Sequence, residues 1–303
     1  MPEAKARVGI IGGSGFYRID GLTDAEELRI DTPFGAPSGE IVVGRLEAQS
    51  VAFLARHGRG HRILPSELPS RANVYALKTL GVEIIIGVSA VGSLREEIEP
   101  LHLVVPDQLI DRTRGRPSTF FGEGLVAHVA FGDPFCPDVS PALAAATRQA
   151  GATVHGGGAY VCVEGPAFST RAESNLYRSW GADVIGMTAL PEAKLAREAE
   201  VCYALLASAT DYDSWQDDGA HVTAEMIVSN LTRNAAVSLE ALRVFLRDLP
   251  EDRTCDCRSA LASALVTPFD QAPPETLAKL EPLIAKYRPD GHPSGRAAAG
   301  KAT

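Results

Sequence analysis

Short apolar runs alternate with amphipathic stretches along most of this chain. The run Glu83–Val88 (EIIIGV) is rich in β-branched residues, which is typical of a strand covered on both faces. Between Ser70 and Leu80 the apolar side chains recur at helical spacing instead. The pattern predicts strands at Arg7–Ile11, Glu40–Leu46, Ser50–Ala55, Glu83–Val88, Leu103–Val105, Tyr160–Glu164, Ala182–Ile185 and Cys202–Ala209. It predicts helices at Ser70–Leu80, Pro141–Ala150, Arg171–Trp180, Glu192–Glu200 and Thr223–Leu246.

This alternation predicts an α/β fold: a single domain with a mixed, largely parallel central β-sheet flanked by helices. A chain of 303 residues is long enough to bury a full core without disulfides or a metal. The domain is expected to cover residues 1–287. The remainder, 288–303, begins Arg-Pro-Asp-Gly-His-Pro-Ser-Gly and is predicted to be a disordered tail.

The charge balance limits the partners of the protein. Lys and Arg number 29 against 38 Asp and Glu, so the formal net charge is −9. That balance argues against binding to nucleic acid or to an anionic membrane through bulk charge, although a few local donors suffice for a small anion. The sequence has no apolar window near 18 residues and no recognisable leader, and we expect a cytoplasmic protein.

The five cysteines are an odd number and lie far apart in the sequence. No pair has the spacing of a zinc motif, so we expect no metal site and a reducing compartment. Two interpretations of the Cys-Asp-Cys stretch stay open: two cysteines near a helix start, or a strained disulfide. The cysteines are Cys136, Cys162, Cys202, Cys255 and Cys257.

Small or polar residues follow three predicted strands in the first half of the chain. The turn Gly12-Gly13-Ser14-Gly15 offers backbone amides and a hydroxyl to an anion, or is a turn without a ligand. Arg56-His57 places two donors where α/β ligands collect, unless Arg56 joins a surface ion pair. Ser89-Ala90-Val91-Gly92-Ser93 allows close approach of a ligand, or simply makes a turn.

The second half holds sharper features. The loop 164–173 opens a helix, and its Phe168 can stack on a planar ring or belong to the core. Gly186-Met187-Thr188 ends another strand. Asp211 and Asp213 follow a buried run, where carboxyls either cap or turn the chain, or carry a raised pKa and donate a proton to a leaving group.

Ten segments occur in the order found in 5′-methylthioadenosine phosphorylases, a family within the larger purine nucleoside phosphorylase group. The resemblance runs from about Val8 to Trp215, and the stretch with Cys-Asp-Cys resembles microbial members. The segments are GIIGGSG, DTPFGAPS, ARHGRGH, SAVGSLREEI, DQLIDRT, DPFCP, EGPAFSTRAES, WGADVIGMT, PEAKLAREAE and ATDYDSW.

The resemblance implies phosphorolysis. Phosphate attacks C1′ of 5′-methylthioadenosine and releases adenine and 5-methylthioribose 1-phosphate. The alternative is a purine nucleoside phosphorylase acting on adenosine or on the 6-oxopurine nucleosides inosine and guanosine. Inorganic phosphate is a co-substrate and no cofactor is expected. The residues that match the family's phosphate site are Ser14, Arg56, His57, Ser89, Ala90 and Thr188.

The resemblance also implies which residues contact the nucleoside. Met187 matches the residue against the ribose and Phe168 the aromatic near the base, while Asp211 and Asp213 match the pair at the purine edge. An ionised carboxylate accepts from a 6-amino group and leaves a 6-oxo group unpaired, so two Asp residues favour aminopurines.

Three further positions concern specificity. Ser169 and Ala224 match positions that tune the choice of base and 5′-group. Gly186 stands where many methylthioadenosine phosphorylases carry Asn, and it resembles the 6-oxopurine branch.

The resemblance further implies a homo-oligomer, expected to be a trimer. His128 matches a residue that family members lend to the 5′-pocket of a neighbouring subunit. A helix at Thr276–Tyr287 is expected to close that pocket with leucines.

Two other classes compete with an enzyme of this family. A dinucleotide-binding oxidoreductase would explain the first glycine turn but needs an acidic residue about 20 positions on, and Asp20 and Asp24 are nearer than that. A non-catalytic nucleoside-binding module would keep the pocket without needing the phosphate hydroxyls.

Overall fold

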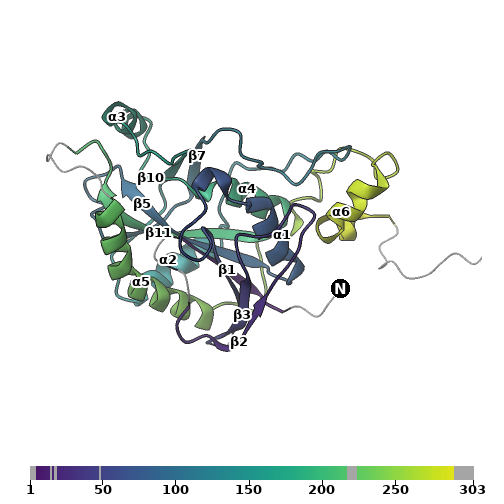
Figure 1. Cartoon of the computed structure of the whole chain (residues 1–303), viewed down its shortest axis with the longest axis horizontal. Coiled ribbons are helices and arrows are strands. Elements are labelled where there is room, and N and C mark those ends of the chain that lie inside the picture. Colours follow the sequence, from purple (N-terminus) through teal and green to yellow (C-terminus); the bar gives the residue numbers. More distant parts are fainter. Residues whose placement is uncertain (1–4, 14–15, 17–18, 48, 217–223, 290–303) are drawn as a thin grey trace, which may run out of the picture.

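A mixed β-sheet runs through the molecule. The computed structural model describes residues 5–13, 16, 19–47, 49–216 and 224–289, with the side chains of 224–228 left out. Eleven strands of this part form one sheet (Figure 1). They are β1 (Val8–Gly12), β2 (Thr23–Leu28), β3 (Ile41–Leu46), β4 (Gln49–Ala55), β5 (Ile84–Ser93), β6 (Leu103–Val105), β7 (Gln108–Arg112), β8 (Val154–Gly156), β9 (Ala159–Val163), β10 (Val184–Gly186) and β11 (Cys202–Tyr212).

The long strand β5 is the centre of the sheet. The main path runs β2-β3-β4-β1-β5-β10-β9-β7, and a branch runs from β5 through β11 and β6 to β8. β5 is parallel to β1 and β11 but antiparallel to β10. Its first part therefore lies between two parallel strands, and its last residues turn toward β10.

Helices cover both faces of the sheet. One apolar cluster joins the sheet to α1, α4 and α6, and a second joins it to α2 and α5. Successive isoleucines of β5 enter the two clusters in turn, because neighbouring side chains of a strand point to opposite faces. The helices are α1 (Ser70–Thr79), α2 (Val139–Gln149), α3 (Arg171–Ser179), α4 (Ala189–Glu198), α5 (Ala224–Arg247) and α6 (Pro274–Ile284).

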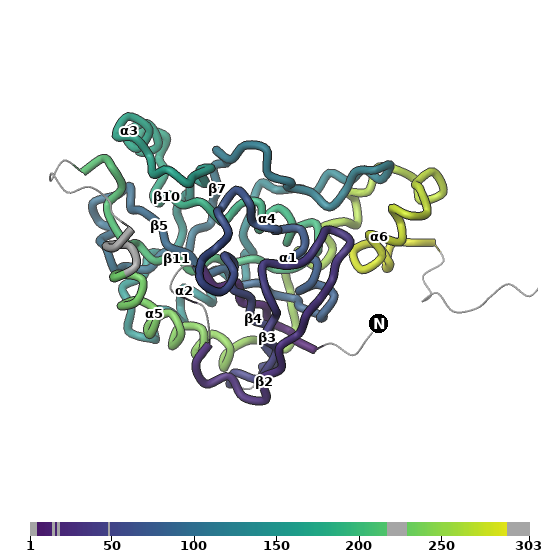
Figure 2. Tube along the Cα trace, viewed as in Figure 1, coloured from purple at the N-terminus to yellow at the C-terminus, as the bar shows by residue number. Residues whose placement is uncertain are grey.

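Helices α3 and α6 lie on opposite sides of the molecule (Figure 2). α3 packs on a small third cluster through Tyr177, near the end of β10. Figure 2 shows α3 on the side of the molecule opposite α6. α6 packs on the cluster of α1 and α4 through its leucines, and a helix there was predicted at Thr276–Tyr287.

The predicted fold class is confirmed, and most predicted elements lie within a few residues of their observed bounds. The pattern missed β2, β7 and β8. No helix in the described part of the chain is long and apolar enough to cross a membrane. The domain boundary at 287 stays a prediction, and residues 290–303 of the expected tail lie outside the described residues.

Candidate active site at the carboxyl end of the sheet

Three predicted segments lie at one level of the sheet. Those after Gly12 and Ala55 leave β1 and β4, whereas Ser89–Ser93 continues β5, so the interpretation of this segment as a turn is wrong. Gly12 pairs in register with Ala55 of β4 and with Val88 of β5. The residues that follow these three therefore lie side by side. A Cβ on Gly13 would lie 2.6 Å from the Val88 carbonyl oxygen and 2.9 Å from Nη1 of Arg56, so only glycine fits. Ser14 lies outside the described residues.

Arg56 is completely buried and is held by an ion pair. Its Nε donates to Glu192 Oε1 (2.5 Å) and its Nη2 to Oε2 (3.0 Å). Nη1 donates to the Val88 carbonyl (2.8 Å) and Nη2 to that of Ile11 (3.3 Å). Burial lowers the pKa of Arg56, but the carboxylate of Glu192 outweighs this and raises it above its ordinary value. Four of the five N–H groups are thus used within the protein, and one Nη1 hydrogen remains for a ligand.

This ion pair corrects one of the two interpretations of Arg56. The sequence left open a surface ion pair, whereas the side chains of both partners are only 1% exposed. Tyr203 of β11 completes the network by donating its hydroxyl to Glu192 Oε2 (3.0 Å). Arg56 is therefore fixed in orientation by β11 and α4 together.

His57 is buried beside Arg56 and is neutral at pH 7. Burial lowers its pKa to about 4, and the charge of Arg56 acts in the same direction. Its Nδ1 lies 2.8 Å from the carbonyl oxygen of Ile63. Since a carbonyl can only accept, Nδ1 carries the hydrogen and Nε2 is an acceptor. His57 stacks on His61, with 4.4 Å between ring centroids.

Ser89 and Thr188 meet although 99 positions separate them. Their hydroxyl oxygens are 3.2 Å apart, and both residues are buried. The Ser89 hydroxyl also donates to the carbonyl of Ala90 (3.0 Å). Thr188 is the residue before α4, and its backbone N–H donates to the Tyr160 hydroxyl (3.4 Å). The hydroxyl of Ser89 in β5 and that of Thr188, just before α4, thus lie side by side.

Gly186 is explained by the same tyrosine. A Cβ at Gly186 would lie 2.1 Å from the hydroxyl oxygen of Tyr160 and 2.7 Å from its Cζ. Tyr160 is 0% exposed, so it cannot swing away. The space that a side chain at this position needs is therefore filled by Tyr160.

Met187 is positioned by two neighbours that the sequence did not single out. Arg116 donates to the carbonyls of Met187 (2.7 Å) and Leu190 (2.9 Å), and also to that of Glu164 (2.6 Å). A Cβ on Gly165 would lie 2.4 Å from the Met187 sulfur, and Gly165 has φ +66°. Both the close contact and the backbone conformation therefore require glycine at this position. These contacts fix Met187 between β9 and α4.

A β-bulge aims Asp211. In the pairing of β11 with β5, Ala209 lies opposite Val91 and Asp211 opposite Gly92, which leaves Thr210 as the extra residue. The Thr210 hydroxyl donates to Asp211 Oδ1 (2.6 Å). Burial raises the pKa of Asp211 to about 6, more than this hydrogen bond lowers it. Asp211 is part of a strand, so the capping interpretation is wrong.

Asp213 also lies next to Gly92. A Cβ on Gly92 would lie 3.2 Å from Asp211 Oδ2 and 3.2 Å from the Cβ of Asp213. Burial raises the pKa of Asp213 as well. Its Oδ2 is buried and makes no hydrogen bond of ordinary geometry, although the side chains of Ser174 and Ser169 act against burial and lower the pKa of the carboxyl. An unpartnered buried carboxyl oxygen indicates a place where a ligand donates or accepts a proton.

The loop before α3 borders the aspartates. The Ser214 hydroxyl donates to the carbonyl of Ser169 (2.8 Å). Phe168 is 45% exposed, so the core interpretation is wrong and the ring is available to a ligand. The predicted helix start is confirmed by Thr170, which shares reciprocal hydrogen bonds with Glu173. Ala224 begins α5, but its side chain lies outside the described residues.

His128 lies in a separate surface hollow. The hollow has a volume of about 480 Å³, and among the predicted site residues that the structure describes, His128 alone lines it. The backbone N–H of His128 donates to the carbonyl of Ala264 (2.8 Å). Thr119, Phe121 and Glu198 also line this hollow.

Several site residues form a row along β5. They are Ser89, Thr188, Met187, Gly92, Asp211 and Asp213. Ser89 faces Thr188 at one end, and Gly92 faces both aspartates at the other. β10 runs antiparallel to β5, so Met187 falls between these two points. Three residue steps of a strand separate the ends by about 10 Å.

Ligand atoms close enough to share a metal ion occur elsewhere. Among the described residues they are the sulfurs of four cysteines at the amino end of β11. The wide spacing of these residues along the sequence did not predict that grouping.

Comparisons with known proteins agree on one family. A model of the phosphorylase superfamily matches residues 7–247. S-methyl-5'-thioadenosine phosphorylase of Koribacter versatilis is 57% identical over 283 residues, which cover 93% of this chain and 97% of that protein. The enzyme of that name from Geobacter sulfurreducens is 54% identical over 92% of this chain and 98% of its own.

Solved structures are similar as well. A methylthioadenosine phosphorylase from an antarctic soil metagenomic library has a TM-score of 0.88 and 49% identity, covering 93% of this chain and 99% of its own. A mutant of adenosine/methylthioadenosine phosphorylase from Schistosoma mansoni in complex with methylthioadenosine has a TM-score of 0.77 and 35% identity, covering 86% of this chain and 96% of its own.

Proposed function

Since this chain belongs to the phosphorylase superfamily, we propose that it cleaves 5′-methylthioadenosine with inorganic phosphate. The products are adenine and 5-methylthioribose 1-phosphate, and the reaction is a pentosyl transfer. Relatives more than 50% identical over nearly the whole chain carry the name of that activity.

The order of groups along β5 is the observation that carries the proposal. It runs from the hydroxyls of Ser89 and Thr188, past Met187, to the carboxyls of Asp211 and Asp213. This is the order phosphate, ribose, base in the reacting complex, and the span of about 10 Å suits a nucleoside with phosphate beneath C1′. A dinucleotide oxidoreductase would not need this order.

At the phosphate end, most of the hydrogen-bond donors to phosphate are neutral groups. The hydroxyls of Ser14, Ser89 and Thr188, the amide of Ala90 and the one available N–H of Arg56 donate to the anion. His57 offers an acceptor at Nε2, which suits the remaining hydrogen of a phosphate monoanion or dianion. Phosphate bound in this way keeps an oxygen free to attack C1′. Its charge also stabilises the oxocarbenium-like transition state.

At the base end, the two aspartates divide donor and acceptor roles. One protonated carboxyl donates to N7 as the glycosidic bond breaks, and the other, ionised, accepts from the 6-amino group. Burial raises the pKa of both groups, which keeps a proton available near neutral pH. Phe168 stacks on the purine, and Ser169 and Ala224 border the base and the 5′-group.

Adenine nucleosides are favoured over 6-oxopurine nucleosides. Gly186 resembles the 6-oxopurine branch in the sequence, but the buried Tyr160 accounts for that glycine without reference to the base. The substrate preference therefore rests on the aspartates.

We also propose a homotrimer in which His128 serves a neighbouring subunit. Its exposed position in a hollow away from the row on β5 supports this. A His128→Ala variant should raise KM for methylthioadenosine and leave KM for phosphate unchanged, and light scattering should give three times the chain mass. A cytoplasmic location, without nucleic-acid or membrane partners, completes the proposal. None of the five cysteines forms a disulfide, which is consistent with it.

The activity is tested by incubating the protein with methylthioadenosine with and without phosphate. Adenine release that depends on phosphate is expected. Comparing kcat/KM for methylthioadenosine, adenosine and inosine ranks the substrates in that order. Release without phosphate, or inosine ranking first, would overturn the proposal, and binding without release would favour a nucleoside-binding module.

A further inference from the structure

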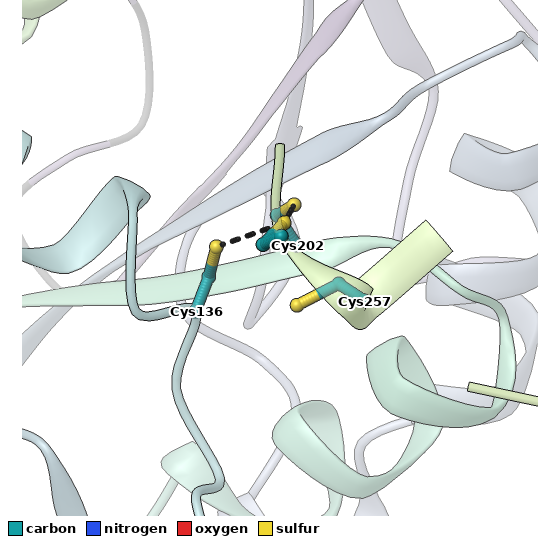
Figure 3. Close-up of side chains that lie close together, drawn as sticks. Cys136, Cys202 and Cys257 are labelled. Atoms are coloured by element: carbon teal, nitrogen blue, oxygen red, sulfur yellow. Dashed lines mark hydrogen bonds between the residues drawn. The ribbon is translucent and has the colours of Figure 1, made fainter. Parts of the chain in front are cut away.

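Four of the five cysteines converge at the amino end of β11. Cys136 precedes α2, Cys202 is the first residue of β11, and Cys255 and Cys257 lie at the start of a short 3-10 helix, η2 (Asp256–Ser259). All four Sγ atoms lie within 4.8 Å of one another. Figure 3 labels three of these residues, Cys136, Cys202 and Cys257. The Sγ of Cys255 is 3.6 Å from that of Cys136 and 3.3 Å from that of Cys202.

Hydrophobic packing alone does not explain why four thiols lie together at this point. All four residues are less than 9% exposed and belong to the apolar cluster of α2 and α5. A buried cysteine ordinarily acts as a small hydrophobic residue. Here three segments that are far apart in the sequence each bring thiols to one point, and thiols are weak hydrogen-bond partners for one another.

The geometry matches a tetrahedral thiolate site. A Zn–S bond of about 2.3 Å in a regular tetrahedron gives sulfur–sulfur distances of about 3.8 Å. The distances of 3.6 Å and 3.3 Å given above are below this value, and all other pairs of these sulfurs lie within 4.8 Å, so small side-chain movements would bring the four sulfurs to tetrahedral positions. We propose that Cys136, Cys202, Cys255 and Cys257 bind one Zn²⁺ ion in a closed structural site.

The surroundings suit the charge of such a site. On binding, each thiol releases its proton to solvent, so Zn²⁺ with four thiolates carries a net charge of −2. Arg253 Nη1 lies 3.8 Å from the Sγ of Cys202. The backbone N–H of Val139 donates to the Sγ of Cys136 (3.5 Å). A cation and an N–H donor next to the sulfurs are what a thiolate site requires of its surroundings.

The role of the ion is structural. Cys202 and Asp211 are nine residues apart on one strand, which places the thiols about 30 Å from the carboxyl. The ion would fasten η2 to β11. The chain then continues to Ala264, whose carbonyl accepts from His128, and to Leu265, which forms a bridge with Ala127. Metal loss should therefore loosen the C-terminal segment without removing any group from the row on β5.

The test uses the full chain, purified under reducing conditions. Elemental analysis of the metal content should give about one zinc per chain, either as purified or after incubation with Zn²⁺ and a competing chelator. Replacement by Co²⁺ should give the intense visible absorption of tetrahedral cobalt thiolate. Removal of the ion should lower Tm by several degrees while phosphorolysis at low temperature continues.

Two variants separate the site from nonspecific binding. Cys257→Ser should lose the zinc, whereas Cys162→Ala should keep it, because Cys162 is buried elsewhere, against the carbonyl of Leu190. The wild-type measurement does not depend on either variant folding. Zinc content no higher than in Cys257→Ser would overturn the proposal. So would fewer than five reactive thiols in denatured, metal-free protein from a second preparation made without reductant, because the cysteines would then be paired as disulfides.

Discussion

The guanidinium of Arg56 meets the carboxylate of Glu192 at two points in a pair that is almost completely buried. Glu192 belongs to α4, so this contact also connects the end of β4 to the helix that follows Thr188. The pair fixes the guanidinium of Arg56 at the proposed phosphate end and leaves it a single N–H for a ligand.

Glu192→Gln should therefore destabilise the protein and weaken phosphate binding. Removing one partner leaves an uncompensated buried charge, which costs about 3–5 kcal/mol. The measurement is urea unfolding together with KM for phosphate, which should rise while KM for the nucleoside changes less. Glu27→Gln is the control, because its pair with Arg59 is more than half exposed and screened by water, and its loss should change stability little. Equal effects in the two variants would contradict the prediction.

Much of the fold could be predicted, because β5 and β11 each begin with a run of mostly apolar residues. β2 was missed because its sequence, TDAEEL, is charged and exposed. β8 was missed because it has only three residues. Such strands are specified by their neighbours rather than by their own composition.

The candidate site likewise contains residues that the sequence predicts and residues that it does not. Strand ends that carry Arg56, Ser89 and Asp211 are visible in the sequence, since polar residues follow apolar runs. Glu192 is not, because it lies 136 positions from Arg56 in a helix where a carboxylate usually faces water. Tyr160, Tyr203 and Arg116 were missed for the same reason: each acts through a partner distant in sequence.

Gly186→Ala should be destabilising, because the added methyl group meets Tyr160. Overpacking of this kind typically costs about 1–3 kcal/mol. Tyr160→Phe removes the nearest atom but leaves Cζ at 2.7 Å, so the double variant should recover part of the loss. Thermal unfolding of the two single variants and the double variant measures this coupling. Gly132→Ala, with nothing within 4 Å, is the control and should change little. Additive effects would mean that the two residues do not clash.

Asp211→Asn should shift the base preference toward 6-oxopurines. Asn can donate to a 6-oxo group, whereas an ionised Asp cannot, and such mismatches change discrimination by one to several powers of ten. Adenosine and inosine share the same 5′-group, so their ratio of kcat/KM isolates the 6-position. Asp213→Asn is the matched variant. If Asp213→Asn alone changes the ratio, Asp213 contacts the 6-position; if neither variant does, the aspartates do not read it.

Asp211 should also make stability depend on pH in the absence of nucleoside. Burial raises its pKa from 3.8 to about 6, so the folded protein holds this proton more tightly than the unfolded chain. The resulting stabilisation is complete below the unfolded pKa and is lost as the pH rises through about 6. Asn carries no charge, so the stability of the Asp211→Asn variant does not fall with pH for this reason. The free energy of unfolding of the variant minus that of the wild type should thus increase by about 1 kcal/mol between pH 5 and pH 7 and then level off. Urea titrations at pH 5, 6, 7 and 8 measure the difference. A difference that stays constant over this range would mean that Asp211 keeps an ordinary pKa, and it would remove Asp211 as the proton donor to N7 near neutral pH.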